Sequence, residues 1–143
     1  MKELRKRVGS FLDAEVDEFS KANGAMPPAA SKHTAVPIDG WASRFDMESS
    51  RLDDVFTFSE ILIAVRAEAL ERMIAQWMRC HAAMHAGPWL EANGNDVNAM
   101  DRFLREEADV DISSCAAEFA EKYPVFTRSE AHIALEEFLE TLG

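Results

Sequence analysis

The longest amphipathic stretch of the chain is residues 57–86, TFSEILIAVRAEALERMIAQWMRCHAAMHA. Apolar side chains recur along it at helical spacing and form one stripe: Phe58, Leu62, Val65, Ala69, Met73, Trp77, Cys80 and Met84. A second set widens this stripe to more than half of the circumference: Ile63, Leu70, Ile74 and Met78. A helix that is apolar over so wide an arc must be surrounded by other elements, so we predict a long central helix over 57–86.

Both ends of this helix carry local signals. Thr57 precedes Glu60 by three residues, which is the capping-box pattern of a helix start. Phe56 and Ile61 occupy the two positions of a hydrophobic staple. The Gly-Pro pair at 87–88 supplies a residue that accepts a positive φ and then one that cannot continue the hydrogen-bond ladder. The helix is therefore predicted to end at residue 86.

The same periodicity predicts further helices. They cover residues 2–22, 97–108, 112–122 and 128–142. Asp96 and Asp111 are placed to cap the second and third of these helices, and Thr127 with Glu130 repeats the capping box before the last. Connections after residue 86 are short, so those helices should pack as neighbours. We expect a single mainly α domain over 1–143, with about five helices organised round the long one.

Two stretches before the central helix lack its periodicity. Residues 23–40 contain Asn-Gly, Pro-Pro and Asp-Gly pairs, which are typical of turns, so a long loop is predicted there. Over residues 41–47, apolar and polar side chains alternate with a period of two. This alternation predicts a small β-hairpin within 41–56 that packs on the central helix, because an isolated hairpin is only marginally stable. The alternative for 41–56 is irregular coil with aromatic anchors.

Composition narrows the class of partner. The chain has 143 residues, is 48% hydrophobic and carries a net charge of −11. Nucleic acids and anionic membranes are polyanions, so we expect neither as a partner. No apolar run approaches the roughly 20 residues of a membrane span, and charges interrupt the apolar residues near the N-terminus, unlike in a secretory signal. With 10 Arg against 5 Lys, typical of a GC-rich bacterial genome, we expect a bacterial, cytoplasmic protein.

The C-terminal third is the most acidic part of the chain. Residues 101–143 hold 11 acidic and 4 basic residues, a net charge of −7. If these acids gather on one face, their field attracts a basic partner and accelerates its association. The alternative is that they are solvated helix faces with no partner. Five glutamates of the last two predicted helices are the candidate partner-binding residues: Glu118, Glu121, Glu136, Glu137 and Glu140.

The chain offers few residues for metal or nucleophile chemistry. His81 and His85 are four residues apart, so they share a helix face and could chelate a transition metal. A simpler explanation is that histidines near a helix C-terminus interact well with the helix dipole. Only Cys115 and His132 remain as distant donors, so a four-ligand zinc site is not expected. We predict no catalytic residue, cofactor or metal, with His81 and His85 as the alternative.

Cys80 and Cys115 each fall at an apolar position of a predicted helix. A buried free thiol behaves as a small hydrophobic group, and it is a poor nucleophile because burial disfavours the thiolate. We therefore expect two free, unreactive cysteines rather than a disulfide or a Cys–His nucleophile.

The sequence holds no phosphate-binding loop, dinucleotide fingerprint or catalytic triad. Our first hypothesis is a non-enzymatic protein that binds a basic protein: an immunity or antitoxin protein, or a phage-type inhibitor, that occludes its partner. One alternative is a chaperone or adaptor, as a monomer or a homodimer, that binds apolar clients through Trp, Met and Phe side chains. The other alternative is a metal-binding protein or enzyme that uses His81 and His85.

Overall fold

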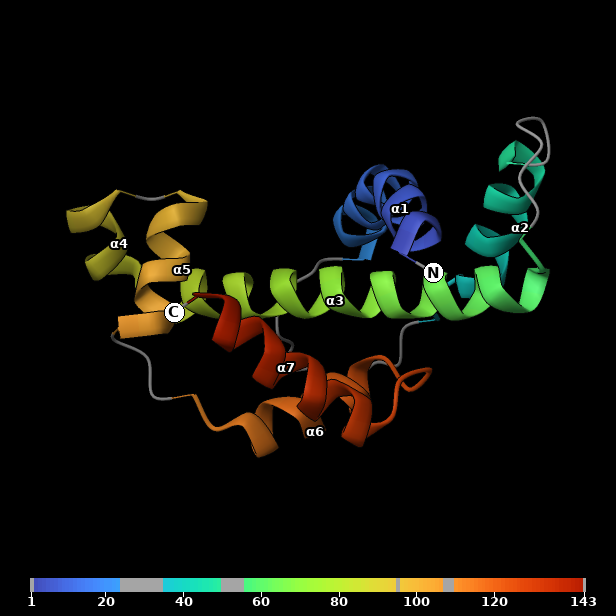
Figure 1. Ribbon diagram of the computed structural model, residues 1–143. Helices are drawn as coiled ribbons and strands as arrows, with labels where there is room; N and C mark the ends of the chain where they lie inside the picture. The colour runs from blue at the N-terminus through green and yellow to red at the C-terminus, as the bar shows by residue number, and fades with distance from the viewer. Residues whose placement is uncertain (1, 24–34, 50–55, 95, 107–109, 143) are drawn as a thin grey trace. The chain divides into compact units, whose positions relative to one another are not determined.

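The computed structural model describes residues 2–23, 35–49, 56–94, 96–106 and 110–142 (Figure 1). Within these ranges the chain is mostly α-helical and contains no β-strand. The helices there are α1 (Lys2–Asn23), α2 (Ile38–Ser49), α3 (Phe58–His85), α4 (Gly87–Asn93), α5 (Val97–Glu106), α6 (Ile112–Lys122) and α7 (Arg128–Leu142). The predicted mainly α fold is confirmed, whereas the predicted number of about five helices is too low.

The described residues fall into two compact units. Unit 1 contains residues 2–23 and 36–72, which comprise α1, α2 and the first half of α3. Unit 2 contains residue 35 and residues 73–142, and it comprises the rest of α3 and helices α4 to α7. Because α3 belongs to both units, most of its apolar side chains enter one of two cores, whereas Phe58, Ile63 and Met84 are exposed. This explains why the apolar arc of this helix is so wide.

Both predicted capping boxes are present. The backbone N–H of Thr57 donates to Glu60 Oε1 at 3.0 Å, and the N–H of Glu60 donates to Thr57 Oγ1 at 3.1 Å. Thr127 and Glu130 form the same reciprocal pair, at 3.0 and 3.1 Å. Each box satisfies donors that the first turn of a helix leaves without a backbone partner. The starts of α3 and α7 therefore lie where the sequence predicted them.

The two predicted aspartate caps are also confirmed. Asp96 Oδ1 accepts a hydrogen bond from the N–H of Ala99 at 2.9 Å before α5, and Asp111 Oδ1 accepts one from the N–H of Ser114 at 3.2 Å before α6. These short-range bonds fix the starts of two helices in unit 2.

The predicted hairpin over 41–56 is wrong, because residues 38–49 form α2. This helix also includes residues 38–40 of the predicted loop. Trp41 and Phe45 are four residues apart, so they fit a period of two and a helical face equally well. Ile38 and Ala42 complete the helical face, and all four side chains are buried. Residues 24–34 of the predicted loop and residues 50–55 lie outside the described part of the chain.

The Gly-Pro pair at 87–88 does more than end α3. The helix stops at His85, one residue before the predicted end, but Gly87 opens α4, which is not among the predicted helices. Pro88 lies in the first turn of α4, where its missing N–H costs nothing. Among the described glycines, the positive φ occurs instead at Gly94, with a value of 93° after the end of α4.

Unit 1 has an apolar core crossed by one buried charge network. α1 contributes a helical stripe of buried residues that faces side chains of α2 and α3: Leu4, Val8, Leu12 and Val16. Glu68 of α3 is only 8% exposed. Its carboxylate accepts a hydrogen bond from Arg5 Nε at 2.7 Å and one from Arg72 Nη1 at 2.8 Å. Because both bonds are charge-assisted, the buried charge is compensated.

Unit 2 is built round an aromatic cluster. The Trp77 ring of α3 makes edge contacts with the rings of Phe119 and Tyr123, at centroid distances of 5.6 and 6.1 Å. Phe126, between α6 and α7, stacks on Phe119 at 5.9 Å. Large rings that meet edge to face stabilise a core beyond the area they bury. This cluster holds α6 and α7 against the second half of α3.

Candidate functional site

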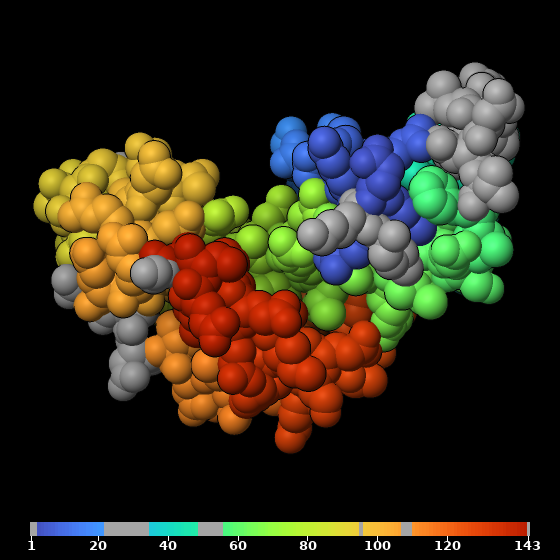
Figure 2. All heavy atoms as spheres, in the orientation of Figure 1, coloured from blue at the N-terminus to red at the C-terminus, as the bar shows by residue number. Residues whose placement is uncertain are grey.

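The five candidate glutamates are all exposed and lie on two helices that pack against each other. Glu118 and Glu121 belong to α6, and Glu136, Glu137 and Glu140 belong to α7. Helical spacing places each set on the side of its helix opposite the buried residues. On α7, for example, the buried residues are Ala131 and Leu135. Figure 2 shows α7, in red, uncovered on the near side of unit 2.

The outward side of α7 also carries an apolar residue that the sequence analysis did not single out. Ile133 is 57% exposed. It lies three, four and seven residues before Glu136, Glu137 and Glu140, so these four side chains share one helix face. We call this set the α7 face. Its signal in the sequence was an isoleucine placed outside the apolar stripe of the last helix.

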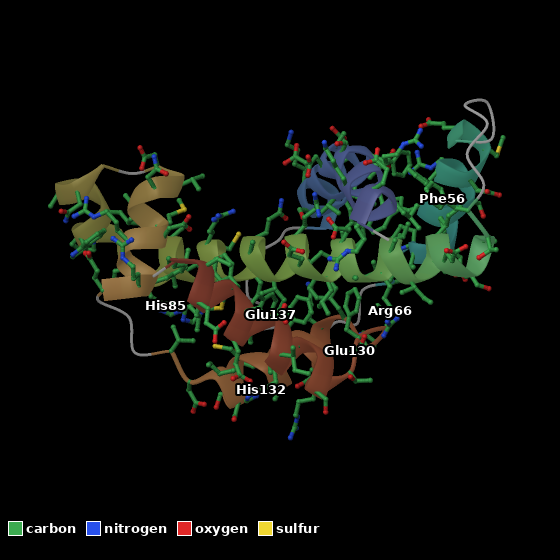
Figure 3. All side chains as sticks on the ribbon, viewed as in Figure 1. Phe56, Arg66, His85, Glu130, His132 and Glu137 are labelled. Carbon is green, nitrogen blue, oxygen red and sulfur yellow. The ribbon has the colours of Figure 1, made fainter. Side chains whose placement is uncertain are left out.

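Most of the five candidate glutamates form no ion pair with another described residue. Glu136 bonds to His132 Nε2 at 3.0 Å. Within the part of the chain that the structure describes, Glu121, Glu137 and Glu140 form no ion pair. Figure 3 shows Glu137 and His132 on different sides of α7. The negative charge of the α7 face is therefore mostly uncompensated and directed into solvent.

The basic residues of unit 2 are few and largely engaged elsewhere. Residues 73–143 contain 13 acidic and 5 basic residues, a net charge of −8, whereas residues 1–72 contain 13 and 10, a net charge of −3. Arg79 donates to both carboxylate oxygens of Asp101, at 2.9 and 3.1 Å. Arg105 donates to the carbonyl oxygen of Leu142 at 3.0 Å and pairs with Glu106. Residues 73–143, which hold helices α4 to α7, therefore carry most of the negative charge of the protein.

His81 and His85 lie together on the last turns of α3. Their ring centroids are 4.4 Å apart and the ring planes are inclined by 47°. The His81 ring is half-buried and the His85 ring is exposed. Burial lowers the pKa of His81, the nearby His85 lowers it further, and the Glu118 carboxylate opposes both effects. His81 is therefore held more in its neutral form than a free histidine.

The other proposed metal donors are not brought to this pair. His132 is bonded to Glu136 on α7. Among the described residues, no group of three or more His, Cys, Asp or Glu side chains is arranged to hold a metal ion. Of the four possible metal donors in the sequence analysis, the structure therefore places only the pair His81 and His85 together among the described residues.

Cys80 and Cys115 are both free, and each is half-buried rather than fully buried as predicted. Burial raises the pKa of the Cys80 thiol. Burial also raises the pKa of Cys115, with further contributions from Glu118 and Asp111. A raised pKa keeps a thiol protonated and weakens it as a nucleophile. The expectation of unreactive thiols therefore has a physical basis in this structure.

Unit 1 contains an open groove between α1 and α2 with a volume of about 420 Å³. Phe11 and Phe45 meet edge to face in it, with ring centroids 5.8 Å apart. The other lining residues are polar or charged: Glu3, Lys6, Arg7, Ser10 and Glu48. Because acidic and basic groups share this lining, the groove favours no single class of charged ligand.

No protein-family model, curated protein or solved structure matches this chain. None of the described helices is both long enough and apolar enough to cross a membrane. The case for a function therefore depends on the residues themselves. The feature with the clearest physical consequence is the uncompensated charge of α6 and α7.

Proposed function

We propose that this protein binds a basic protein through the outward glutamates of α6 and α7 and occludes that partner's functional cleft. The observation that carries the proposal is the α7 face, where Glu137 and Glu140 are exposed and have no counter-charge among the described residues. A concentrated negative field raises the association rate of a basic partner. The most concrete form is an immunity or antitoxin protein, or a phage-type inhibitor, in a bacterial cytoplasm.

Ile133 adds a reason to prefer a protein partner over free ions. An apolar side chain that is exposed between charges can enter a pocket of a partner while the charges surround the contact and exclude water. Small cations would neutralise the glutamates but would gain nothing from the isoleucine. The mechanism we propose is therefore steric occlusion guided by charge, with no chemical step.

The chaperone or adaptor hypothesis finds less support. It requires exposed Trp, Met and Phe side chains. Trp41 and Trp77 are buried, at 3% and 2% exposure, and the aromatic residue among the exposed large apolar side chains of the described chain is Phe58, at 39%. The larger exposed apolar side chains outside the α7 face include Met47, Ile63 and Met84. Met47 lies on α2, and Ile63 and Met84 lie near opposite ends of α3. Residues spread in this way offer less area to an apolar client than a contiguous patch would.

The test is capture of partners from a lysate of the source organism, at low and at high salt, followed by mass spectrometry. We expect one basic protein that is retained at low salt and lost as the salt concentration rises, because exposed charges are screened. The purified partner should lose its own activity when this protein is added. Retention that is insensitive to salt, or no retained protein at all, would contradict the proposal.

A charge-matched pair of variants then locates the surface. E136Q/E137Q/E140Q removes three charges from the α7 face, and E3Q/E18Q/E48Q removes three exposed charges from unit 1. Both variants have the same net charge. We expect the α7 variant to associate with the partner much more slowly than the control. Equal effects of the two variants would show that net charge, and not this face, governs binding.

A further inference from the structure

The last turns of α3 hold two imidazole rings in a defined relationship that no part of the proposed function uses. His81 and His85 are separated by one helical turn, and their ring centroids lie 4.4 Å apart. Within the described residues, neither ring forms a hydrogen bond or ion pair that would occupy its nitrogens. Figure 3 shows His85 at the end of α3. Two neighbouring rings with unoccupied nitrogens have the composition of a chelating pair.

The spacing of the rings suits chelation of one ion. In a metal site the metal–nitrogen bond is roughly 2.1 Å, so each imidazole centroid lies about 3.2 Å from the metal. Two imidazole nitrogens that make a right angle at the metal therefore place the ring centroids about 4.5 Å apart. The observed separation of 4.4 Å is close to this value. The two rings are therefore already at the separation that two imidazole ligands of one ion require.

The surroundings of the pair also suit a cation. The His81 side chain is half-buried and the His85 side chain is exposed, so an ion can reach the pair from solvent. The Glu118 carboxylate acts electrostatically on His81, so a negative charge lies near the pair.

We propose that His81 and His85 form a two-nitrogen site for one late first-row divalent metal ion, of the class of Ni²⁺, Cu²⁺ and Zn²⁺. A pair of cis nitrogens near a right angle fits octahedral or tetragonal coordination, which Ni²⁺ and Cu²⁺ adopt readily. The two imidazoles fill two positions, and the remaining positions take water or a donor from another molecule. This site does not depend on the α7 face, and it stands or falls separately from the proposed function.

The test is calorimetric titration of the full chain with Ni²⁺, which cysteine thiols do not reduce. We expect one ion per chain, and His85→Ala should weaken binding about tenfold or more because it removes the chelate effect. The matched control is His132→Ala, which removes a partly exposed histidine of α7 that is paired with Glu136. This control should bind Ni²⁺ as the wild type does. Cys80→Ser should also retain the affinity.

A second readout keeps the test decisive if a variant folds poorly. In the wild-type protein, Ni²⁺ should selectively broaden the NMR imidazole signals of His81 and His85, whereas those of His132 remain sharp. The proposal is overturned if the wild type binds no Ni²⁺, if His85→Ala binds it as tightly as the wild type, or if His132→Ala loses as much affinity as His85→Ala. In each of these cases the histidine pair is explained by its favourable position at a helix C-terminus.

Discussion

Gly9 of α1 lies so close to Arg72 of α3 that a Cβ atom at residue 9 would stand 2.7 Å from the guanidinium Nη2. The same Cβ would lie 2.9 Å from Glu68 Oε1. Moving either side chain aside would disturb other hydrogen bonds, because Arg72 Nε donates to Asp13 at 2.7 Å and Glu68 also accepts from Arg5. The absence of a side chain at Gly9 therefore allows Arg72 and Glu68 to lie close to the backbone of α1.

We predict that Gly9→Ala lowers the free energy of unfolding by about 1 kcal/mol or more, because displaced partners lose charge-assisted hydrogen bonds. Gly40→Ala is the matched control, since a Cβ at this second helical glycine meets only Pro37 Cβ, at 3.8 Å. It should raise stability by up to about 1 kcal/mol through helix propensity. Denaturant unfolding of both variants measures the difference. If Gly9→Ala and Gly40→Ala stabilise the protein equally, the side chains of Arg72 and Glu68 can move away from residue 9 without loss of stability.

Glu68→Gln should destabilise the protein by about 1–3 kcal/mol, since it leaves two guanidinium groups without their shared carboxylate. The expected loss of stability is moderate because Arg5 and Arg72 are partly exposed to water. Glu71→Gln is the control: this exposed residue contacts Arg5 at 3.4 Å and should change stability by less than about 0.5 kcal/mol. If both glutamines have the same effect, burial of Glu68 contributes nothing.

His81 makes stability depend on pH. Its pKa is lowered from the ordinary value of 6.5, so the folded state binds fewer protons than the unfolded state as pH falls below that value. The stability that this difference contributes is fully present above pH 6.5, and it is lost as pH falls through the lowered pKa of the folded state. We expect the wild type to lose more stability than His81→Gln between about pH 7.5 and about pH 5. If the free energy of unfolding falls equally with pH in the two proteins, His81 is not the source of the pH dependence.

Tyr123 is the single tyrosine of the chain, so its ionisation can be followed directly by absorbance. Burial raises the pKa of its phenol to about 12, with a contribution from Cys80. The unfolded chain loses this proton near the ordinary value of 10.0, so stability present below that pH is lost as pH rises toward 12. The phenol should titrate at higher pH in the native protein than in urea. Coincident titration curves would show that the ring is solvated.

Several elements of the fold followed from contacts between residues that are near in sequence. The pairs Thr57–Glu60 and Thr127–Glu130 close hydrogen bonds across three residues, so the starts of α3 and α7 needed no knowledge of distant neighbours. Helical periodicity likewise placed the candidate glutamates of α6 and α7 opposite the apolar stripes, where the structure has them exposed. For these features the local chain contains all the interacting atoms.

Other features depended on partners far along the chain. The four-residue separation of Trp41 and Phe45 satisfies both a strand and a helix, and packing of Phe11 on Phe45 and Phe19 on Trp41 accompanies the helical alternative. Whether a glutamate is neutralised also depends on long-range geometry: Glu68 meets Arg5 across 63 residues, whereas Glu137 meets no described counter-charge. Local patterns therefore specified helices and their exposed faces, but burial and charge pairing were set by which helices pack together, since both depend on atoms distant in the sequence.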